Sequence, residues 1–192
     1  SVLKNANAEN VKGGKIIANN IKIAEEDLFN ITCLHDKVEI PKTSYEGNGN
    51  LICVGGGKDS CVSLELLKNE PANSCFIINP KGPSYNTCLT AGYTAENIIT
   101  VDRILDRKIV ELNKEGYLNG HTPFSSIVAF ISYLVAYLNG KKNIILSNEA
   151  SANQPTVIGT KINHQYSKTY EFEQDFVNYM NEFIGLNINY FS

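Results

Sequence analysis

The chain has 192 residues, 43% of them hydrophobic and 19% charged, with a formal net charge of −3. This length and composition indicate one globular domain with at most a small appendage, and the lack of Lys or Arg runs excludes an extended nucleic-acid interface. The five cysteines form no CxxC pair, which argues against a zinc cluster and indicates a cytoplasmic protein. The longest apolar stretch, residues 124–138, is too short to span a bilayer, so no membrane partner is expected.

The N-terminal quarter of the chain differs in pattern from the rest. Residues 15–40 alternate apolar and polar side chains around an Asn-Asn pair, which predicts short antiparallel strands. Residues 41–50 are rich in turn-forming residues and indicate a linker. We therefore expect a small N-terminal β appendage with its linker over residues 1–45, followed by the main domain over residues 46–192.

Continuous apolar runs and amphipathic segments alternate in the main domain. The runs predict strands buried on both faces, at 51–54, 74–79, 97–101 and 143–147. Helices are predicted between and after them, at 60–69, 84–91, 103–115, 123–139 and 170–184. This alternation predicts an α/β fold with a parallel sheet and helices on both faces.

The sequence GGGKDS, from Gly55 to Ser60, lies between the first buried strand and its helix. Glycine lets the backbone approach a ligand without a Cβ in the way, and the amides of a helix N-terminus attract anions. Lys58 adds a positive charge, and Ser60 can cap the helix or donate to an oxygen. The loop therefore predicts a phosphate site, with a simple tight turn as the alternative. A Walker A loop and a dinucleotide fingerprint are both excluded by the spacing.

Two further stretches carry candidate acid–base groups. His121 precedes Thr122-Pro123, a favourable start for a helix, whose positive end would keep the imidazole neutral and able to act as a base. Glu149 follows the fourth strand among small and amide residues, where its carboxylate could hold Mg²⁺ or transfer a proton. The alternatives are a histidine that completes a turn and a solvated loop glutamate.

Other polar residues near strand ends are candidates for binding. Asn79 could meet adenine or ribose, or only form a turn with Pro80. Arg103 and Arg107 are predicted one turn apart on a helix, facing phosphate or solvent. His164, Tyr166 and Lys168 precede the last helix and could bind a substrate's phosphate or carboxylate, or belong to a polar edge strand.

GGGKDS resembles the SGGKDS signature of the PP-loop ATP pyrophosphatase superfamily, with Gly55 where that family has serine. The resemblance implies a Rossmann-like parallel sheet, in agreement with the pattern of strands and helices. It also implies that the loop holds the β and γ phosphates of ATP while a substrate is adenylated and pyrophosphate leaves. The serine's hydroxyl contact is lost at Gly55, which leaves either a weakened loop or one that binds through its backbone alone.

Four stretches together, GGGKDS, NGHTP, SNEASA and NHQYSK, are similar to the PP-loop epimerases that act on UDP-N-acetylmuramoyl-L-alanyl-L-glutamate in peptidoglycan precursor synthesis. The similarity implies ATP and Mg²⁺ as cofactors and a nucleotide-sugar peptide as the small-molecule substrate. The glutamate carboxylate would be activated as an acyl-adenylate, which makes its α-proton acidic enough to be removed and then returned on the opposite face.

The site that this similarity implies has four groups of residues. The proton carriers would be two of His121, Glu149 and His164. ATP and pyrophosphate would be bound by Gly55, Gly56, Gly57, Lys58, Asp59, Ser60 and Asn79. The substrate would be bound by Asn119, Asn148, Tyr166, Lys168 and Arg103, and the metal by Glu149 and Asp59.

Two other functions are compatible with the sequence. One is a different PP-loop adenylating enzyme, which modifies tRNA or forms an amide. The other is a non-catalytic ATP-binding module, for which the glycine at position 55 would be the sign of lost catalysis.

Overall fold

The computed structural model describes residues 11–12, 15–16, 44–117, 123–155, 159, 163 and 165–192. The backbone divides into two compact units. One contains Ser1–Glu39 and Ile104–His121, and the other contains Ile40–Arg103 and Thr122–Ser192. The boundary predicted at residues 45 and 46 stays a prediction, because most of the preceding residues lie outside the described part of the chain.

The described residues of the first unit form two short antiparallel strands and one helix. Strand β1 (Val11–Lys12) pairs with β2 (Lys15–Ile16), in the region where the sequence predicted a β appendage. Helix α4 spans Lys108–Lys114. The predicted helix start at residue 103 was wrong, because the Asp106 carboxylate accepts the backbone N–H of Lys108 at 2.9 Å and so stabilises a turn ahead of the helix. Arg103 and Arg107 therefore do not share a helical face.

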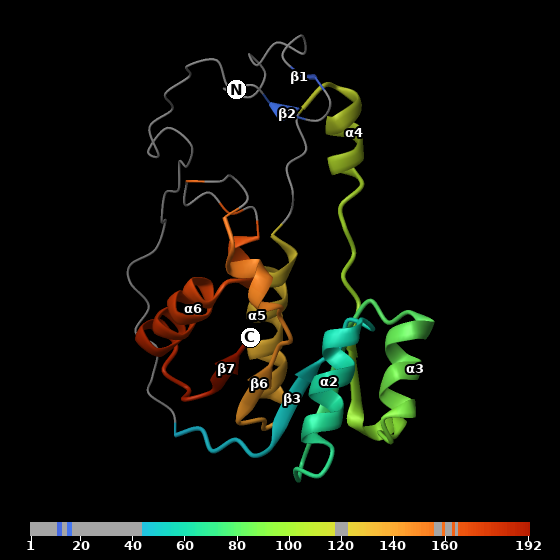
Figure 1. Ribbon diagram of the computed structural model, residues 1–192, viewed down its shortest axis with the longest axis vertical. Helices are drawn as coiled ribbons and strands as arrows, with labels where there is room; N and C mark the ends of the chain where they lie inside the picture. The colour runs from blue at the N-terminus through green and yellow to red at the C-terminus, as the bar shows by residue number, and fades with distance from the viewer. Residues whose placement is uncertain are drawn as a thin grey trace. The chain divides into compact units, whose positions relative to one another are not determined.

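The second unit is built on a parallel sheet, as the apolar runs predicted, and this sheet has five strands, one more than the four runs indicated (Figure 1). Its strands are β3 (Asn50–Cys53), β4 (Ser74–Ile78), β5 (Ile98–Val101), β6 (Asn143–Ile145) and β7 (Asn189–Phe191). Their order across the sheet is β5-β4-β3-β6-β7. The chain thus builds outward from β3 to β5, crosses back beside β3, and continues outward in the other direction, which is a Rossmann-like topology.

Helices cover both faces of this sheet (Figure 1). They are α2 (Lys58–Leu67), α3 (Gly82–Thr90), α5 (Phe124–Leu138) and α6 (Tyr170–Phe183). In the described part of the chain, three short 3-10 turns accompany them: η3 (Ala95–Asn97), η4 (Ala150–Asn153) and η5 (Tyr166–Lys168). Within the described residues, no helix is both long enough and apolar enough to cross a bilayer.

Strand β3 is buried on both faces, which explains why its residues form a continuous apolar run. Successive side chains on a strand point to opposite faces. Ile52 therefore packs with Leu64 of α2 on one face, whereas Leu51 packs in the cluster that contains Phe176 of α6 on the other. Leu51, Ile52 and Leu64 are fully buried, so β3 is the central strand that both helical layers cover.

Candidate functional site

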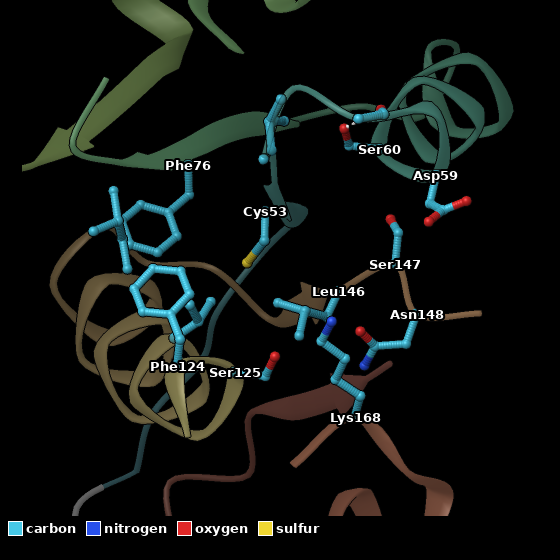
Figure 2. A pocket seen from close by; sticks show the side chains of 15 residues that line it. Cys53, Asp59, Ser60, Phe76, Phe124, Ser125, Leu146, Ser147, Asn148 and Lys168 are labelled. Atoms are coloured by element: carbon cyan, nitrogen blue, oxygen red, sulfur yellow. Dashed lines mark hydrogen bonds between the residues drawn. The ribbon is translucent and has the colours of Figure 1, made fainter. Parts of the chain in front are cut away.

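A cavity of about 340 Å³ lies at the carboxyl edge of the sheet, beyond β3, β4 and β6 (Figure 2). The sheet order reverses between β3 and β6, so this is the switch point at which α/β sheets bind ligands. The residues that line the cavity are Cys53, Val54, Gly55, Gly57, Asp59, Ser60, Phe76, Ile78, Phe124, Ser125, Val128, Leu146, Ser147, Asn148 and Lys168. One part of the wall is apolar, and the part beside the glycine loop is polar.

The glycine loop has the geometry of an anion site. Gly56 takes a φ of +84°, and a Cβ there would lie 3.1 Å from Ser84 Cα. A Cβ at Gly55 or Gly57 would meet no atom within 4 Å, so these two residues leave open space beside their backbone. Gly57 is the N-cap of α2 and supplies no side-chain acceptor. The first amides of α2 are consequently available to a ligand.

Two serine hydrogen bonds stabilise this part of the edge, one within the start of α2 and one between α2 and the segment after β6. The buried Ser60 hydroxyl donates to the Gly57 carbonyl at 2.8 Å and tightens the start of α2. On the next turn, the Ser63 and Ser147 hydroxyls lie 2.6 Å apart and share a hydrogen bond. This bond joins α2 to the segment after β6, so the two sides of the switch point are connected.

Lys58 and Glu149 form an ion pair across the switch point, with Nζ and Oε1 2.7 Å apart. The bond to Glu149 raises the pKa of Lys58. The bond from Lys58, with a second from the Ser151 hydroxyl at 3.2 Å, lowers the pKa of Glu149 and keeps it ionised. The Lys58 side chain is 77% exposed and is absent from the described lining of the cavity, so in this conformation its charge is directed to the glutamate.

Asn79 and Arg103 stabilise the ends of β4 and β5. Asn79 has a φ of +51°, its N–H donates to the Val101 carbonyl at 2.8 Å, and its side-chain oxygen accepts the N–H of Arg103 at 2.5 Å. The Arg103 guanidinium lies over the Phe124 ring, 5.0 Å from its centroid, and Phe124 lines the cavity. Arg103 thus contacts a residue of the cavity wall without being part of the lining, and Asn79 stabilises the backbone of the edge.

Tyr166 lies near the site but faces another group. Its hydroxyl donates to the Asp175 carboxylate, and that bond raises the pKa of Tyr166 to about 12. The ring also packs edge-on against Phe172. Of the described residues in this segment, Lys168 lines the cavity and Tyr166 does not.

Three predicted site residues lie outside the described residues: Asn119, His121 and His164. The structure brings Gly55, Gly57, Asp59, Ser60, Asn148 and Lys168 together around one cavity and places Glu149 beside it through Lys58. Sequence reasoning did not predict roles for Ser125, Ser147 or the apolar wall. Ser147 follows the fourth apolar run directly, and that position at a strand end was the signal that could have identified it.

Asp59 is the one carboxylate among the described residues that line the cavity. Mg²⁺ is usually held by one or two carboxylates together with phosphate oxygens and water. Asp59 lines the cavity next to the glycine loop, whereas Glu149 is engaged with Lys58. Within the described part of the chain, no cluster of three or more His, Cys, Asp or Glu side chains could hold a metal alone. Asp59 therefore fits a metal that arrives with a phosphate ligand.

The fold and the site define a Rossmann-like α/β protein with a cavity that a glycine loop lines at the switch point of a parallel sheet. The chain belongs to the MurL N-terminal domain family, whose model matches residues 16–192. No solved structure matches the chain.

Three curated relatives are named UDP-N-acetyl-alpha-D-muramoyl-L-alanyl-L-glutamate epimerase. The protein from Xanthomonas oryzae pv. oryzae is 35% identical over 144 residues, which cover 74% of this chain and 32% of the relative. The protein from Salinispora tropica is 37% identical over 157 residues, which cover 79% of this chain and 34% of the relative. The protein from a Micromonospora species is 37% identical over 147 residues, which cover 74% of this chain and 32% of the relative. The chain thus spans about a third of the length of these relatives.

Proposed function

We propose that this chain is the ATP-binding part of a cytoplasmic epimerase that inverts the terminal L-glutamate of UDP-N-acetylmuramoyl-L-alanyl-L-glutamate during peptidoglycan precursor synthesis. The names of the three relatives support the substrate and the reaction class. The observation that carries the ATP-dependent mechanism is the bare glycine loop at the switch point, which opens into the cavity beside the uncapped start of α2.

The glycine loop suits the triphosphate of ATP. Its open backbone at Gly55 and Gly57 lets phosphate oxygens approach the amides, and the helix dipole of α2 adds positive potential. Asp59 would hold Mg²⁺ between the protein and the phosphates, and the metal would neutralise charge on the departing pyrophosphate. The apolar wall formed by residues such as Phe76 and Val128 offers a surface for the nucleoside.

Adenylation of the carboxylate would make the α-proton of the glutamate more acidic. The α-proton of a glutamate carboxylate is weakly acidic, because its loss would place a second negative charge beside the first. In the proposed reaction a carboxylate oxygen attacks the α-phosphorus of ATP, the bond to pyrophosphate breaks, and an acyl-adenylate forms. The acyl group is now uncharged, so it can accept the carbanion charge as an enolate. One protein group removes the α-proton, another returns a proton on the opposite face, and water releases AMP.

Glu149 is the described candidate for one of the proton carriers, with His121 and His164 as the others. The ion pair with Lys58 lowers the pKa of Glu149 and so makes it a weak base in this conformation. Phosphate groups bound at the glycine loop compete for Lys58. Once Lys58 turns to them, Glu149 loses its main partner, its pKa rises, and it becomes a better proton acceptor. Nucleotide binding would in this way precede proton transfer.

The proposal is tested by following ATP and the glutamate Cα together. With UDP-N-acetylmuramoyl-L-alanyl-L-glutamate, the protein should form equal amounts of AMP and pyrophosphate and incorporate solvent deuterium at the glutamate Cα. The variant Lys58→Met should reduce both the formation of AMP and pyrophosphate and the incorporation of deuterium. Lys114→Met, which removes a lysine that is not part of the cavity lining, is the matched control. Failure of the chain to bind ATP, or AMP formation that depends on tRNA or an amine instead, would contradict the proposal.

A further inference from the structure

The basic side chain that faces the cavity is not the one in the glycine loop. Lys58 is directed to Glu149, at 2.7 Å. Among the residues that the structure describes, Lys168 is the one basic residue in the lining of the cavity. Figure 2 shows its side chain extending into the cavity, with Asn148 and Ser125 on either side in this view.

The backbone at Lys168 is held firmly. The N–H of Lys168 donates to the Gln165 carbonyl at 2.7 Å. The next residue, Thr169, is buried, and its hydroxyl donates to the Tyr166 carbonyl at 2.8 Å while accepting the N–H of Phe172 at 3.2 Å. Thr169 is thereby the N-cap of α6. The ammonium of Lys168 makes no hydrogen bond or ion pair with any described residue, although its charge helps to lower the pKa of Glu149. A fixed backbone thus presents a charge that has no contact partner among the described residues.

Asn148 supplies a second donor. Its Nδ2 is buried and has no hydrogen-bond partner within the described chain. Buried donors are almost always satisfied, and one that lines a cavity calls for an acceptor from a ligand. Asn148 follows β6 and Ser147, and the latter is fixed to α2 through Ser63, so the amide sits on an anchored segment.

Ser125 completes the group from a third element. It lies in the first turn of α5, a helix of 15 residues whose N-cap, Pro123, provides no side-chain hydrogen bond. A hydroxyl and the positive end of a helix dipole therefore face the same cavity as Lys168 and Asn148. These three side chains offer donors, and together they carry one positive charge.

We infer that Lys168, Asn148 and Ser125 form a second anion subsite, distinct from the glycine loop, which holds a singly charged oxygen group, either a carboxylate or a phosphate diester. One ammonium and two neutral donors match a single negative charge, whereas a terminal phosphate would bring more charge than they balance. The inference rests on the proposed function in one respect: adenylation must bring a carboxylate and the α-phosphate of ATP together, and each carries one charge before they react.

Binding measurements with separate probes test the subsite. The probes are pyrophosphate, the methyl ester of AMP, whose phosphate carries one charge, and the dipeptide L-alanyl-L-glutamate. Lys168→Gln should weaken binding of the methyl ester, the dipeptide or both by about tenfold to a hundredfold, as expected for a lost charged hydrogen bond. Pyrophosphate binding should change by less than about twofold, because the glycine loop remains intact. Lys114→Gln is the control, because it removes a lysine that is not part of the cavity lining.

The pattern of loss separates the possible outcomes. Weaker binding of the methyl ester identifies the α-phosphate as the occupant, and weaker binding of the dipeptide identifies the carboxylate. An equal loss for pyrophosphate, or no loss for any probe, overturns the second subsite, as does an unaltered protein that binds neither singly charged probe. If the unaltered protein binds the methyl ester through Lys168 but does not bind pyrophosphate or ATP, the proposed function fails and the subsite stands. A second variant, Asn148→Asp, should repel the same probes with thermal unfolding unchanged.

Discussion

Lys58 and Glu149 join the two loops that flank the switch point, with their charged atoms 2.7 Å apart. Lys58 begins α2 after β3, and Glu149 follows β6 directly ahead of η4. Neither side chain is part of the cavity lining, so the pair lies beside the cavity, between the two loops that contribute to its wall. A lysine that the sequence predicts for phosphate is thus already matched with a carboxylate, and phosphate has to compete with it.

This competition predicts opposite effects of two substitutions on pyrophosphate binding. Glu149→Gln frees Lys58 and should tighten pyrophosphate binding by about threefold, in keeping with the modest strength of exposed ion pairs. Lys58→Met should weaken it. Titration calorimetry of both variants against Glu111→Gln, on helix α4, measures the effect. Weaker pyrophosphate binding in Glu149→Gln would show that the glutamate assists phosphate binding, for example through a metal, rather than competing with it.

The glycine loop predicts a contrast between neighbouring glycines. Gly56→Ala places a Cβ 3.1 Å from the Ser84 backbone at a φ of +84°, and it should destabilise the fold by about 1–3 kcal/mol. Gly55→Ala meets no atom within 4 Å and should leave the free energy of unfolding nearly unchanged while weakening ATP binding. Chemical denaturation and nucleotide titration distinguish the two. Equal stability of both variants would mean that Gly56 is not held at this φ in solution.

Much of the fold could be predicted because buried parallel strands have a simple signature. Four apolar runs identified β3 to β6, and periodicity identified the helices between them. Strand β7 was not predicted. It has only three residues, of which Tyr190 alone is buried, and it forms because Asn143 of β6 pairs with Asn189 beside it. A signal that depends on a partner distant in sequence cannot be recognised from local pattern.

The site could be predicted in its chemistry more than in its geometry. Gly55, Gly57, Asp59, Asn148 and Lys168 do surround one cavity, because strand ends of a parallel sheet meet at one edge. The different roles of Lys58 and Lys168 could not be predicted. They depend on positions in space, where Lys58 pairs with Glu149 and Lys168 pairs with no described residue. The apolar wall was also missed, because residues such as Phe124 have the same helical spacing whether they face the core or a cavity.

A row of asparagines across the sheet predicts a loss of stability far from the site. Asn189 donates to Asn143 at 2.8 Å, Asn143 donates to Asn50 at 2.9 Å, and Asn50 donates to Asn73 at 2.8 Å. Asn143→Ala breaks two of these bonds in the middle of the row and should lower the free energy of unfolding by about 1–3 kcal/mol. Urea denaturation measures it, with the exposed Asn86→Ala as control. A value equal to that of the control would show that water replaces both bonds without loss.

The buried thiol of Cys53, which lines the inner end of the cavity, predicts how stability changes at high pH. Burial raises the pKa of Cys53 from 9.0 to about 12, with a smaller opposing effect of its hydrogen bond with Ser132. Below pH 9 the thiol is neutral in both the folded and the unfolded chain, so its contribution to stability is fully present. Between pH 9 and about 12 the unfolded chain releases the proton while the folded chain retains it, so the free energy of unfolding should fall as pH rises.

Cys53→Ala removes this group and should lose less stability over the same range, whereas Cys61→Ala, at an exposed position, should follow the unaltered protein. Denaturation of the three proteins at pH 8, 9 and 10 checks the difference, and parallel pH dependences for all three would rule out a buried, neutral thiol at position 53.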